Sequence, residues 1–168
     1  MLSEPEAIAL MKKHAQDDGS LRAVLAHSKL VQGIALRIAA KFPESDKDFI
    51  RIACILHDIG RLKTQDPLQH GIKGAEILRK KGLKEFADVC ERHLGAGISK
   101  EEIMRQELPL PPRDFLPKTI EEKIITAADN LTENDREISR EQSTERFRKE
   151  LGEDVARKIT ALFDELGI

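Results

Sequence analysis

A predicted helix that is apolar on every side constrains this fold more than any other feature. Residues 52–56 read Ile-Ala-Cys-Ile-Leu and lie within a helix expected from Phe49 to about Ile59. A helix without a polar face must be covered by other elements all round, so it belongs at the centre of the fold. A chain of 168 residues can bury such a helix in one domain without disulfides or structural metals.

The elements around that helix are expected to be helices too. The sequence has no Trp or Tyr and six Phe, which disfavours a β-sandwich. Apolar periodicity and breaker residues predict further helices over residues 3–16, 20–42, 68–81, 84–94, from 99 onward, 119–134 and 143–166. N-caps are expected at Ser3, Ser20, Ser45 or Asp46, Ser99 and Thr119. The sequence therefore predicts an all-α fold, a single-domain helical bundle over residues 1–168.

Two segments near the C-terminal end have special roles in this prediction. Residues 107–118 hold four prolines, which exclude a helix or a central strand, so we expect a rigid surface loop and a candidate lid. Residues 143–166 predict one amphipathic helix with an apolar stripe from Phe147 to Phe163. That stripe is expected to pack on its own chain, and both a monomer and a homodimer stay open.

Charge and cysteine content bear on partners and location. The 28 Lys and Arg against 30 Asp and Glu give a net charge of −2, without a strong basic field that would attract nucleic acid. Cys54 and Cys90 lie in apolar stretches without a CxxC spacing, as expected for reduced core cysteines. There is no signal peptide and no apolar run of about 18 residues. We expect a soluble cytoplasmic protein without nucleic-acid or membrane partners.

Four polar residues are expected to point inward. His57 and Asp58 end the apolar helix, His27 shares a helical stripe with Val31, and Asp129 lies on the inner face of its helix. The ordinary alternative for the His57-Asp58 pair is a helix end that reaches solvent, and for His27 it is a hydrogen-bonded core histidine. A buried carboxylate is costly unless it is paired or binds a metal. One divalent cation bound by imidazole and carboxylate would account for all four residues.

Two further histidines can extend this site. His70 and His93 both lie next to glycines that allow close approach of the backbone, and with Asp58 as a bridge they could hold a second metal. For each histidine taken alone, an ordinary surface position is the favoured interpretation. Arg61 and Lys63 follow the His-Asp pair directly and are candidates for binding phosphate, Arg by bidentate contact and Lys as a point charge. The alternative is that both are ordinary solvated charges.

The order of these residues resembles a known signature. His27, the sequence His57-Asp58-Ile59-Gly60 and then Asp129 are similar to the H…HD…D pattern of the HD-domain (HDIG) superfamily of metal-dependent phosphohydrolases. Residues 69–78, 91–97 and 117–123 resemble a mainly archaeal subfamily, and the resemblance covers about residues 20–135.

The resemblance implies an all-α fold with His27, His57, Asp58 and Asp129 as ligands of one metal. In the dinuclear branch of the superfamily, two further histidines complete a second site that the HD aspartate bridges, and His70 and His93 occupy their place in the order. That branch includes diadenosine-tetraphosphate hydrolases and HD-GYP cyclic-dinucleotide phosphodiesterases. The GYP motif is absent here, which argues against hydrolysis of cyclic dinucleotides.

The expected function is metal-dependent hydrolysis of a phosphate ester or anhydride, on a nucleotide or another small phosphate compound. One or two divalent ions (Fe, Mn, Co, Ni, Zn or Mg) would activate water, with Asp58 and His57 as the catalytic pair. The sequence has no Rossmann fingerprint, P-loop or G-x-S-x-G elbow, so an enzyme here has to use a metal. A diiron oxygenase and a non-catalytic nucleotide-binding module stay open as alternatives.

Overall fold

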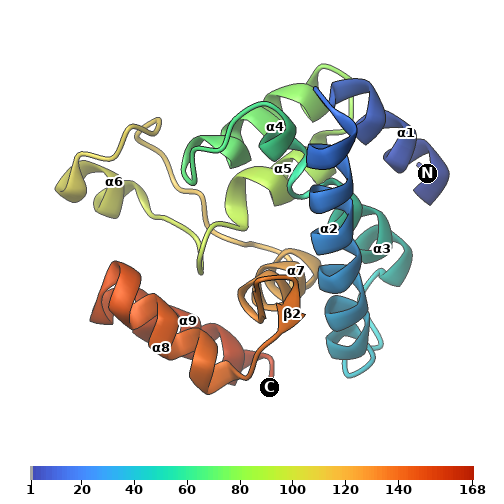
Figure 1. Cartoon of the computed structure of the whole chain (residues 1–168). Coiled ribbons are helices and arrows are strands. Elements are labelled where there is room, and N and C mark those ends of the chain that lie inside the picture. Colours follow the sequence, from blue (N-terminus) through green and yellow to red (C-terminus); the bar gives the residue numbers. More distant parts are fainter. Residues whose placement is uncertain (1) are drawn as a thin grey trace.

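The computed structural model describes residues 2–168 and is built almost entirely of helices (Figure 1). The predicted all-α fold is confirmed. In chain order the elements are α1 (Glu4–His14), α2 (Asp18–Ala39), α3 (Lys47–Leu56), the 3₁₀ helix η1 (Ile59–Leu62), α4 (Gln69–Arg79), α5 (Lys84–Arg92), α6 (Lys100–Gln106), α7 (Ile120–Asn130), β1 (Thr132–Glu133), β2 (Arg136–Glu137), α8 (Arg140–Leu151) and α9 (Glu153–Glu165).

The C-terminal half of α3 is buried among other helices, as its sequence predicts, whereas Lys47, Asp48 and Arg51 in its N-terminal half are exposed. Residues 52–56 are all buried, and α3 contacts α1, α2, α5 and α7. The helix ends at Leu56, three residues before the expected end at Ile59, because the chain tightens into η1. His57 therefore caps α3, and Asp58 stands at the junction between the two helices. A polar pair is thus held at the buried end of α3.

The glycine of the HDIG sequence is required by close packing of η1 on α4. A Cβ atom placed on Gly60 would lie 1.8 Å from the carbonyl oxygen of His70 and 2.6 Å from the backbone nitrogen of Gly74. Both neighbours are backbone atoms of α4, which cannot rotate out of the way. Any larger residue at this position has to push η1 and α4 apart.

We expect Gly60→Ala to lower the free energy of unfolding by about 3 kcal/mol or more, because overpacking against backbone forces the helices apart. The matched control is Gly33→Ala in α2, where a Cβ would meet nothing within 4 Å. That change should raise stability by about 0.5–1 kcal/mol through helix propensity. Urea unfolding measures both variants, and equal stability of Gly60→Ala and wild type would contradict the packing argument.

Most helix starts follow the predicted caps. Ser3 and Ser99 form capping boxes, and Asp46 and Thr119 cap α3 and α7. The prediction of Ser20 as a cap is wrong. The Asp17 side chain accepts the Ser20 backbone N–H at 2.8 Å, so α2 begins at Asp18 and Ser20 is in its first turn. An aspartate is as good an N-cap as serine, and here it comes three residues earlier.

The C-terminal region differs from the single helix expected over residues 143–166. It forms a hairpin of two helices, α8 and α9, which are joined at Gly152 with φ +92°. This backbone conformation ends α8 and suits glycine, so the chain turns back on itself. The expected helix 119–134 also ends early, because Asn134 and Asp135 both have positive φ and form the turn between β1 and β2. Two positive φ values are what a two-residue hairpin turn requires.

The proline-rich loop 107–118 contains no helix, as predicted, and lies beside α6 (Figure 1). Leu110 and Phe115 are buried in a small second apolar cluster with Ile103. Phe115 also pairs with Ile98 through backbone hydrogen bonds of 2.8 and 3.0 Å. Within residues 2–168 no helix is long and apolar enough to cross a membrane.

Candidate metal centre

The fold brings together all six side chains that the sequence predicts as metal ligands. They come from separate elements that meet around the end of α3. His27 lies on α2, His70 on α4 and Asp129 on α7, while His57 and His93 cap α3 and α5. Asp58 lies between α3 and η1. Residues up to 102 positions apart in sequence therefore share one site.

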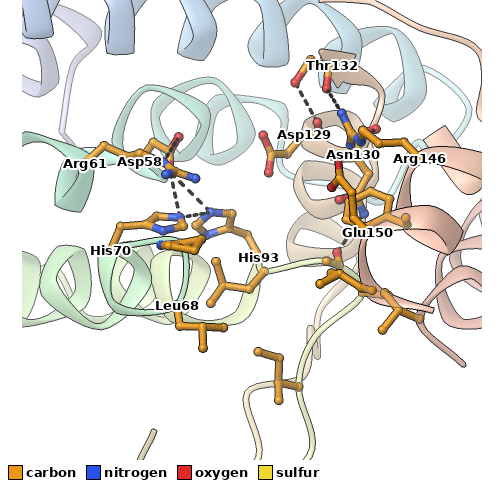
Figure 2. A pocket seen from close by; sticks show the side chains of 18 of the residues that line it. Asp58, Arg61, Leu68, His70, His93, Asp129, Asn130, Thr132, Arg146 and Glu150 are labelled. Atoms are coloured by element: carbon orange, nitrogen blue, oxygen red, sulfur yellow. Dashed lines mark hydrogen bonds and ion pairs between the residues drawn. The ribbon is translucent and has the colours of Figure 1, made fainter. Parts of the chain in front are cut away.

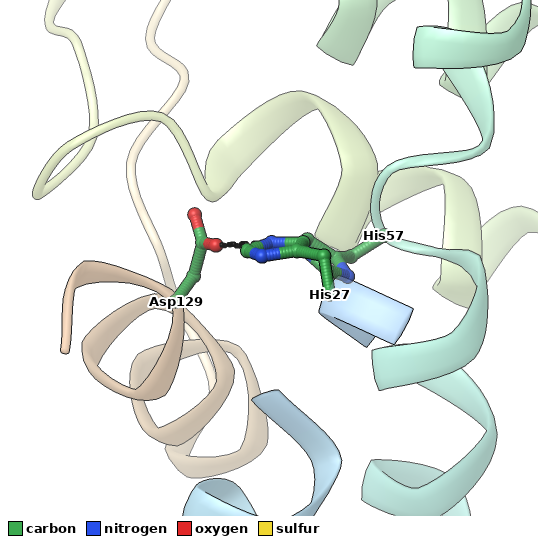
Figure 3. A group of neighbouring side chains, drawn as sticks. All are labelled: His27, His57 and Asp129. Carbon is green, nitrogen blue, oxygen red and sulfur yellow. Dashed lines mark hydrogen bonds and ion pairs between the residues drawn. The ribbon is translucent and has the colours of Figure 1, made fainter. Parts of the chain in front are cut away.

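One group of ligand atoms gathers around Asp129. Its Oδ1 lies 2.9 Å from Nε2 of His27 and 3.6 Å from Nε2 of His57. Figure 3 shows the two imidazole rings lying close together beside the carboxylate. The three residues satisfy the spacing expected of ligands to one cation. The His27 and Asp129 side chains are 23 % and 22 % exposed, so this group is open to solvent on one side.

Asp58 lies between this group and a second one. Its Oδ2 lies 3.6 Å from Nε2 of His27 and 3.8 Å from Nε2 of His57. Its Oδ1 lies 3.1 Å from Nε2 of His70 and 3.5 Å from Nε2 of His93. Figure 2 shows the Asp58, His70 and His93 side chains pointing toward one another. The two oxygens of one carboxylate thus face two different pairs of histidines.

The backbone fixes the direction of three of the rings. Nδ1 of His57 donates to the carbonyl of Cys54 at 2.8 Å, and Nδ1 of His93 donates to the carbonyl of Cys90 at 2.7 Å. His70 makes a longer contact of the same kind, 3.3 Å to the carbonyl of Asp66. A proton held on Nδ1 leaves Nε2 of a neutral ring with its lone pair directed into the site. Metal-binding histidines are oriented in this way in many proteins.

Two buried polar atoms in the site have no hydrogen-bond partner. They are Nε2 of His57 and Oδ1 of Asp58. The His57 ring is completely buried, and an unpaired polar atom in such a place carries a desolvation cost. Imidazole and carboxylate together are the donor set of Zn²⁺, Mn²⁺, Fe²⁺, Co²⁺ and Ni²⁺. The residues present therefore fit a divalent transition metal.

Both carboxylates of the site are held in the charged form. Burial by itself would raise the pKa of the Asp58 carboxyl, but the neighbouring rings of His57, His70 and His93 hold that pKa well below its usual range. Burial opposes ionisation of Asp129 as well, and the contact with His27 and the nearby His57 ring hold the pKa of Asp129 well below the usual value. Two anionic carboxylates among four imidazoles provide the negative charge that a cation needs.

The two cysteines are buried and free, as the sequence predicts. Burial raises the pKa of both thiols above the usual value. Neither thiol is therefore available as a nucleophile at neutral pH.

The candidate metal centre opens into a cavity of about 1220 Å³. Arg61 lines this cavity, and its Nε lies 3.4 Å from Oδ2 of Asp58. The structure does not bring Lys63 to the same place, because the side chain is exposed and its charge acts on His14 instead. In a 3₁₀ helix residues three apart lie on one side, so Arg61 lies over Asp58 while Lys63 faces elsewhere.

Sequence reasoning missed the part of the cavity wall that α8 and α9 form. Arg146, Phe147, Leu151, Val155 and Lys158 all line it. The i, i+4, i+8 spacing of residues 147, 151 and 155 led to the expectation of a helix packed on the core. Gly152 interrupts this stripe, and it is the residue that could have indicated two helices with a turn between them instead of one.

An ion-pair network holds α5, and with it His93, in place. The buried carboxylate of Glu91 accepts from Arg79 at 2.8 Å and from Arg113 of the proline-rich loop at 2.8 and 3.0 Å. Arg92 donates to Glu122 of α7 at 2.8 Å. The loop 107–118 and α7 are thereby tied to the helix whose last turn positions His93.

Comparison with known proteins agrees with this geometry. The HD domain family model matches residues 24–134. The uncharacterized protein MJ0778 of Methanocaldococcus jannaschii is 43 % identical over 84 % of each chain. The tRNA (cytidine(56)-2′-O)-methyltransferase of Picrophilus torridus is 38 % identical over 97 % of this chain, and that of Thermoplasma volcanium is 38 % identical over 83 %. The chain spans less than half of the length of either methyltransferase, 46 % and 40 %.

Solved structures show the same fold at low sequence identity. The HD domain of the phosphodiesterase PgpH from L. monocytogenes superposes with a TM-score of 0.55, at 20 % identity, over 95 % of this chain and 94 % of that one. Its complex with cyclic-di-AMP gives a TM-score of 0.56 at the same identity, over 95 % and 92 % of the two chains. Because the HD domain model matches residues 24–134, which is most of the sequence, the chain belongs to the HD-domain family.

Proposed function

We propose that this protein is a metal-dependent phosphohydrolase that acts on a nucleotide or a related small phosphate compound. One observation carries the proposal: the Asp58 carboxylate lies between two pairs of histidine Nε2 atoms, with 3.1 to 3.8 Å from its oxygens to the four nitrogens. A carboxylate in that position can be shared by two cations. Pairs of divalent ions that share a ligand are typical of enzymes that cleave phosphate esters.

The ligand roles follow from the two groups. We assign His27, His57 and Asp129 to one ion, His70 and His93 to the other, and Asp58 to both. Divalent cations bound there would lower the pKa of a water molecule toward neutrality and neutralise charge on phosphate oxygens. The backbone contacts of His57 and His93 support these roles, since they keep both Nε2 atoms unprotonated and directed inward.

Arg61 is the side chain that we assign to phosphate binding. Its guanidinium lies beside Asp58 at the wall of the cavity and is about one third exposed, so it can reach a phosphate oxygen without leaving its ion pair. Asp58 in turn holds the guanidinium toward the metal ligands. Lys63 has no part in this proposal, because it does not line the cavity.

The similar proteins support the reaction class more than the substrate. The PgpH domain is named a phosphodiesterase and was solved with cyclic-di-AMP, so cyclic dinucleotides belong among the substrates to be tested. Two relatives are named tRNA methyltransferases, and the present chain matches less than half of each. We propose that the matched part carries phosphohydrolase chemistry and that the remainder of those proteins carries the methyl transfer of their name.

The experiment is a phosphate-release screen of the purified protein with Mn²⁺, Fe²⁺, Co²⁺ or Ni²⁺ against nucleotides, cyclic dinucleotides and dinucleoside polyphosphates. We expect release from at least one substrate, with none in the presence of a chelator and no methyl transfer to tRNA. Oxygen uptake by the iron-loaded protein without phosphate release would favour a diiron oxygenase instead. Tight nucleotide binding without turnover by the metal-loaded protein would favour a non-catalytic binding module.

A further inference from the structure

The cavity is larger than a phosphate group needs. Its volume of about 1220 Å³ exceeds the usual range of small-molecule sites, which is roughly 300–1,000 Å³. The candidate metal ligands and Arg61 form one part of its wall, and the α8–α9 hairpin forms another. If the phosphate of a substrate binds at the metal ligands, the cavity has room for the rest of the molecule, here called its body, to reach the hairpin.

The hairpin contributes an apolar surface to this wall. Phe147 and Leu151 are one helical turn apart on α8, and Val155 follows on α9. Leu151 is 60 % exposed, and among the described residues Met104 is the other large apolar side chain exposed to this extent. Met104 does not line the cavity, whereas Leu151 does. Apolar side chains exposed at the wall of a cavity that also holds a few convergent polar groups are typical of a surface that packs on a ligand.

The charges around the cavity do not favour a second or third phosphate. In the described part of the chain, three cationic side chains line it. Two of them are bound to protein acceptors: Arg146 donates to the carbonyls of Thr132 at 2.7 Å and Asn130 at 3.2 Å. Lys158 contacts the Glu102 carboxylate at 2.8 and 2.9 Å and the carbonyl of Gly97 at 2.6 Å. These contacts hold Arg146 and Lys158 at the hairpin side of the cavity, and Arg61, which is paired with Asp58, is the cation beside the candidate metal ligands.

Carboxylates outnumber Arg146 and Lys158 on the outer wall, which is the part of the cavity wall away from the candidate metal ligands. Glu133, Asp135 and Glu150 line the cavity without a metal-ligand role, in addition to Glu102. Figure 2 shows Glu150 and Arg146 together on the side of Asp129 and Asn130, away from His70. Such a wall repels further phosphate groups and accepts hydrogen bonds from hydroxyl or amino groups.

We propose that the substrate is a phosphomonoester with a single phosphate group and an uncharged body, and that this body packs on Phe147, Leu151 and Val155. A nucleoside has the required size, an apolar planar base and hydroxyl donors for the carboxylates. This inference rests on the proposed phosphohydrolase function and names the substrate class of the same site. The hairpin is thereby the element that sets specificity.

The reaction is a hydrolysis that balances without a further reactant. The oxygen of water forms a bond to phosphorus while the phosphorus–oxygen bond to the body breaks. The leaving oxygen takes one proton from the water, so the products are the free alcohol and inorganic phosphate.

The test compares substrates on the Mn²⁺-loaded full chain. We expect kcat/KM for AMP to exceed that for ADP, ATP and cyclic-di-AMP by about tenfold or more, because charge on the outer wall opposes extra phosphates. It should also exceed the value for methyl phosphate, which has no body to pack. A preference for ADP, ATP or cyclic-di-AMP would overturn the inference and leave the phosphohydrolase function standing. No release from any of these compounds would overturn the inference, and no release from the dinucleoside polyphosphates either would overturn the phosphohydrolase function as well.

Two substitutions locate the effect on the hairpin. Leu151→Ser should lower the ratio of kcat/KM for AMP to that for methyl phosphate by about tenfold, since one apolar contact is lost. Met104→Ser is the matched control, an equally exposed apolar residue outside the cavity, and it should leave the ratio unchanged. An unchanged ratio in Leu151→Ser, in a protein with wild-type circular dichroism, would overturn the role of the hairpin.

Discussion

Replacing Asp58 with asparagine will lower phosphate release by about a thousandfold or more. The substitution keeps the size of the side chain and removes its charge. One oxygen of the present carboxylate faces His27 and His57, and the other faces His70 and His93. An amide offers a single oxygen and places N–H donors against histidine nitrogens, so it cannot serve both groups. Metal content, measured by mass spectrometry after dialysis, should fall together with activity.

The matched control for this variant is Asp48→Asn. Asp48 lies in the first turn of the same helix, α3, with an exposed side chain that is remote from the site. It should keep wild-type activity and wild-type metal content. If Asp58→Asn retained full activity and full metal content, the assignment of the centre would be wrong.

His93→Ala will reduce the bound metal from about two ions to about one per chain. The ring of His93 contributes Nε2 to the group around Oδ1 of Asp58, and its Nδ1 is held by the carbonyl of Cys90. Removing it leaves His70 and half of a shared carboxylate, too few protein ligands for tight binding of a transition metal. The group of His27, His57 and Asp129 stays complete, so one ion should remain.

Two controls test whether His93→Ala loses metal because it fails to fold. His14→Ala removes the histidine that lies outside the candidate centre, at the end of α1, and should leave about two ions bound. Far-UV circular dichroism should be unchanged in both variants. Equal metal content in His93→Ala and wild type would indicate a mononuclear centre.

Much of the centre could be predicted because its residues lie on regular helices. His27 shares a stripe with buried Val31 and Ile34, and Asp129 follows buried Ile125 by one helical turn, so periodicity alone directs both inward. The contacts that orient the rings are also local. His57 and His93 each bond to the carbonyl three residues before them, and in both cases that residue is a cysteine.

The parts that sequence reasoning missed depend on backbone turns and on distant partners. Periodicity continues through residues 147, 151 and 155, and only the positive φ of Gly152 turns one helix into a hairpin. Arg61 and Lys63 look equivalent in sequence, and the 3₁₀ geometry of η1 brings only Arg61 to the cavity wall. The hydrogen bonds that hold Arg146 and Lys158 involve carbonyls and a carboxylate up to 61 residues away, and no local sequence pattern predicts them.

The central claim is that Asp58 and its four histidines form a two-metal centre that hydrolyses phosphate esters. The most direct measurement is a titration of the metal-free protein with Mn²⁺, in which bound metal and phosphate release from a nucleotide are read in the same samples. We predict that binding saturates at about two ions per chain and that phosphate release rises with the second ion. Saturation at two ions without phosphate release, or full release from protein that binds none, would contradict the account.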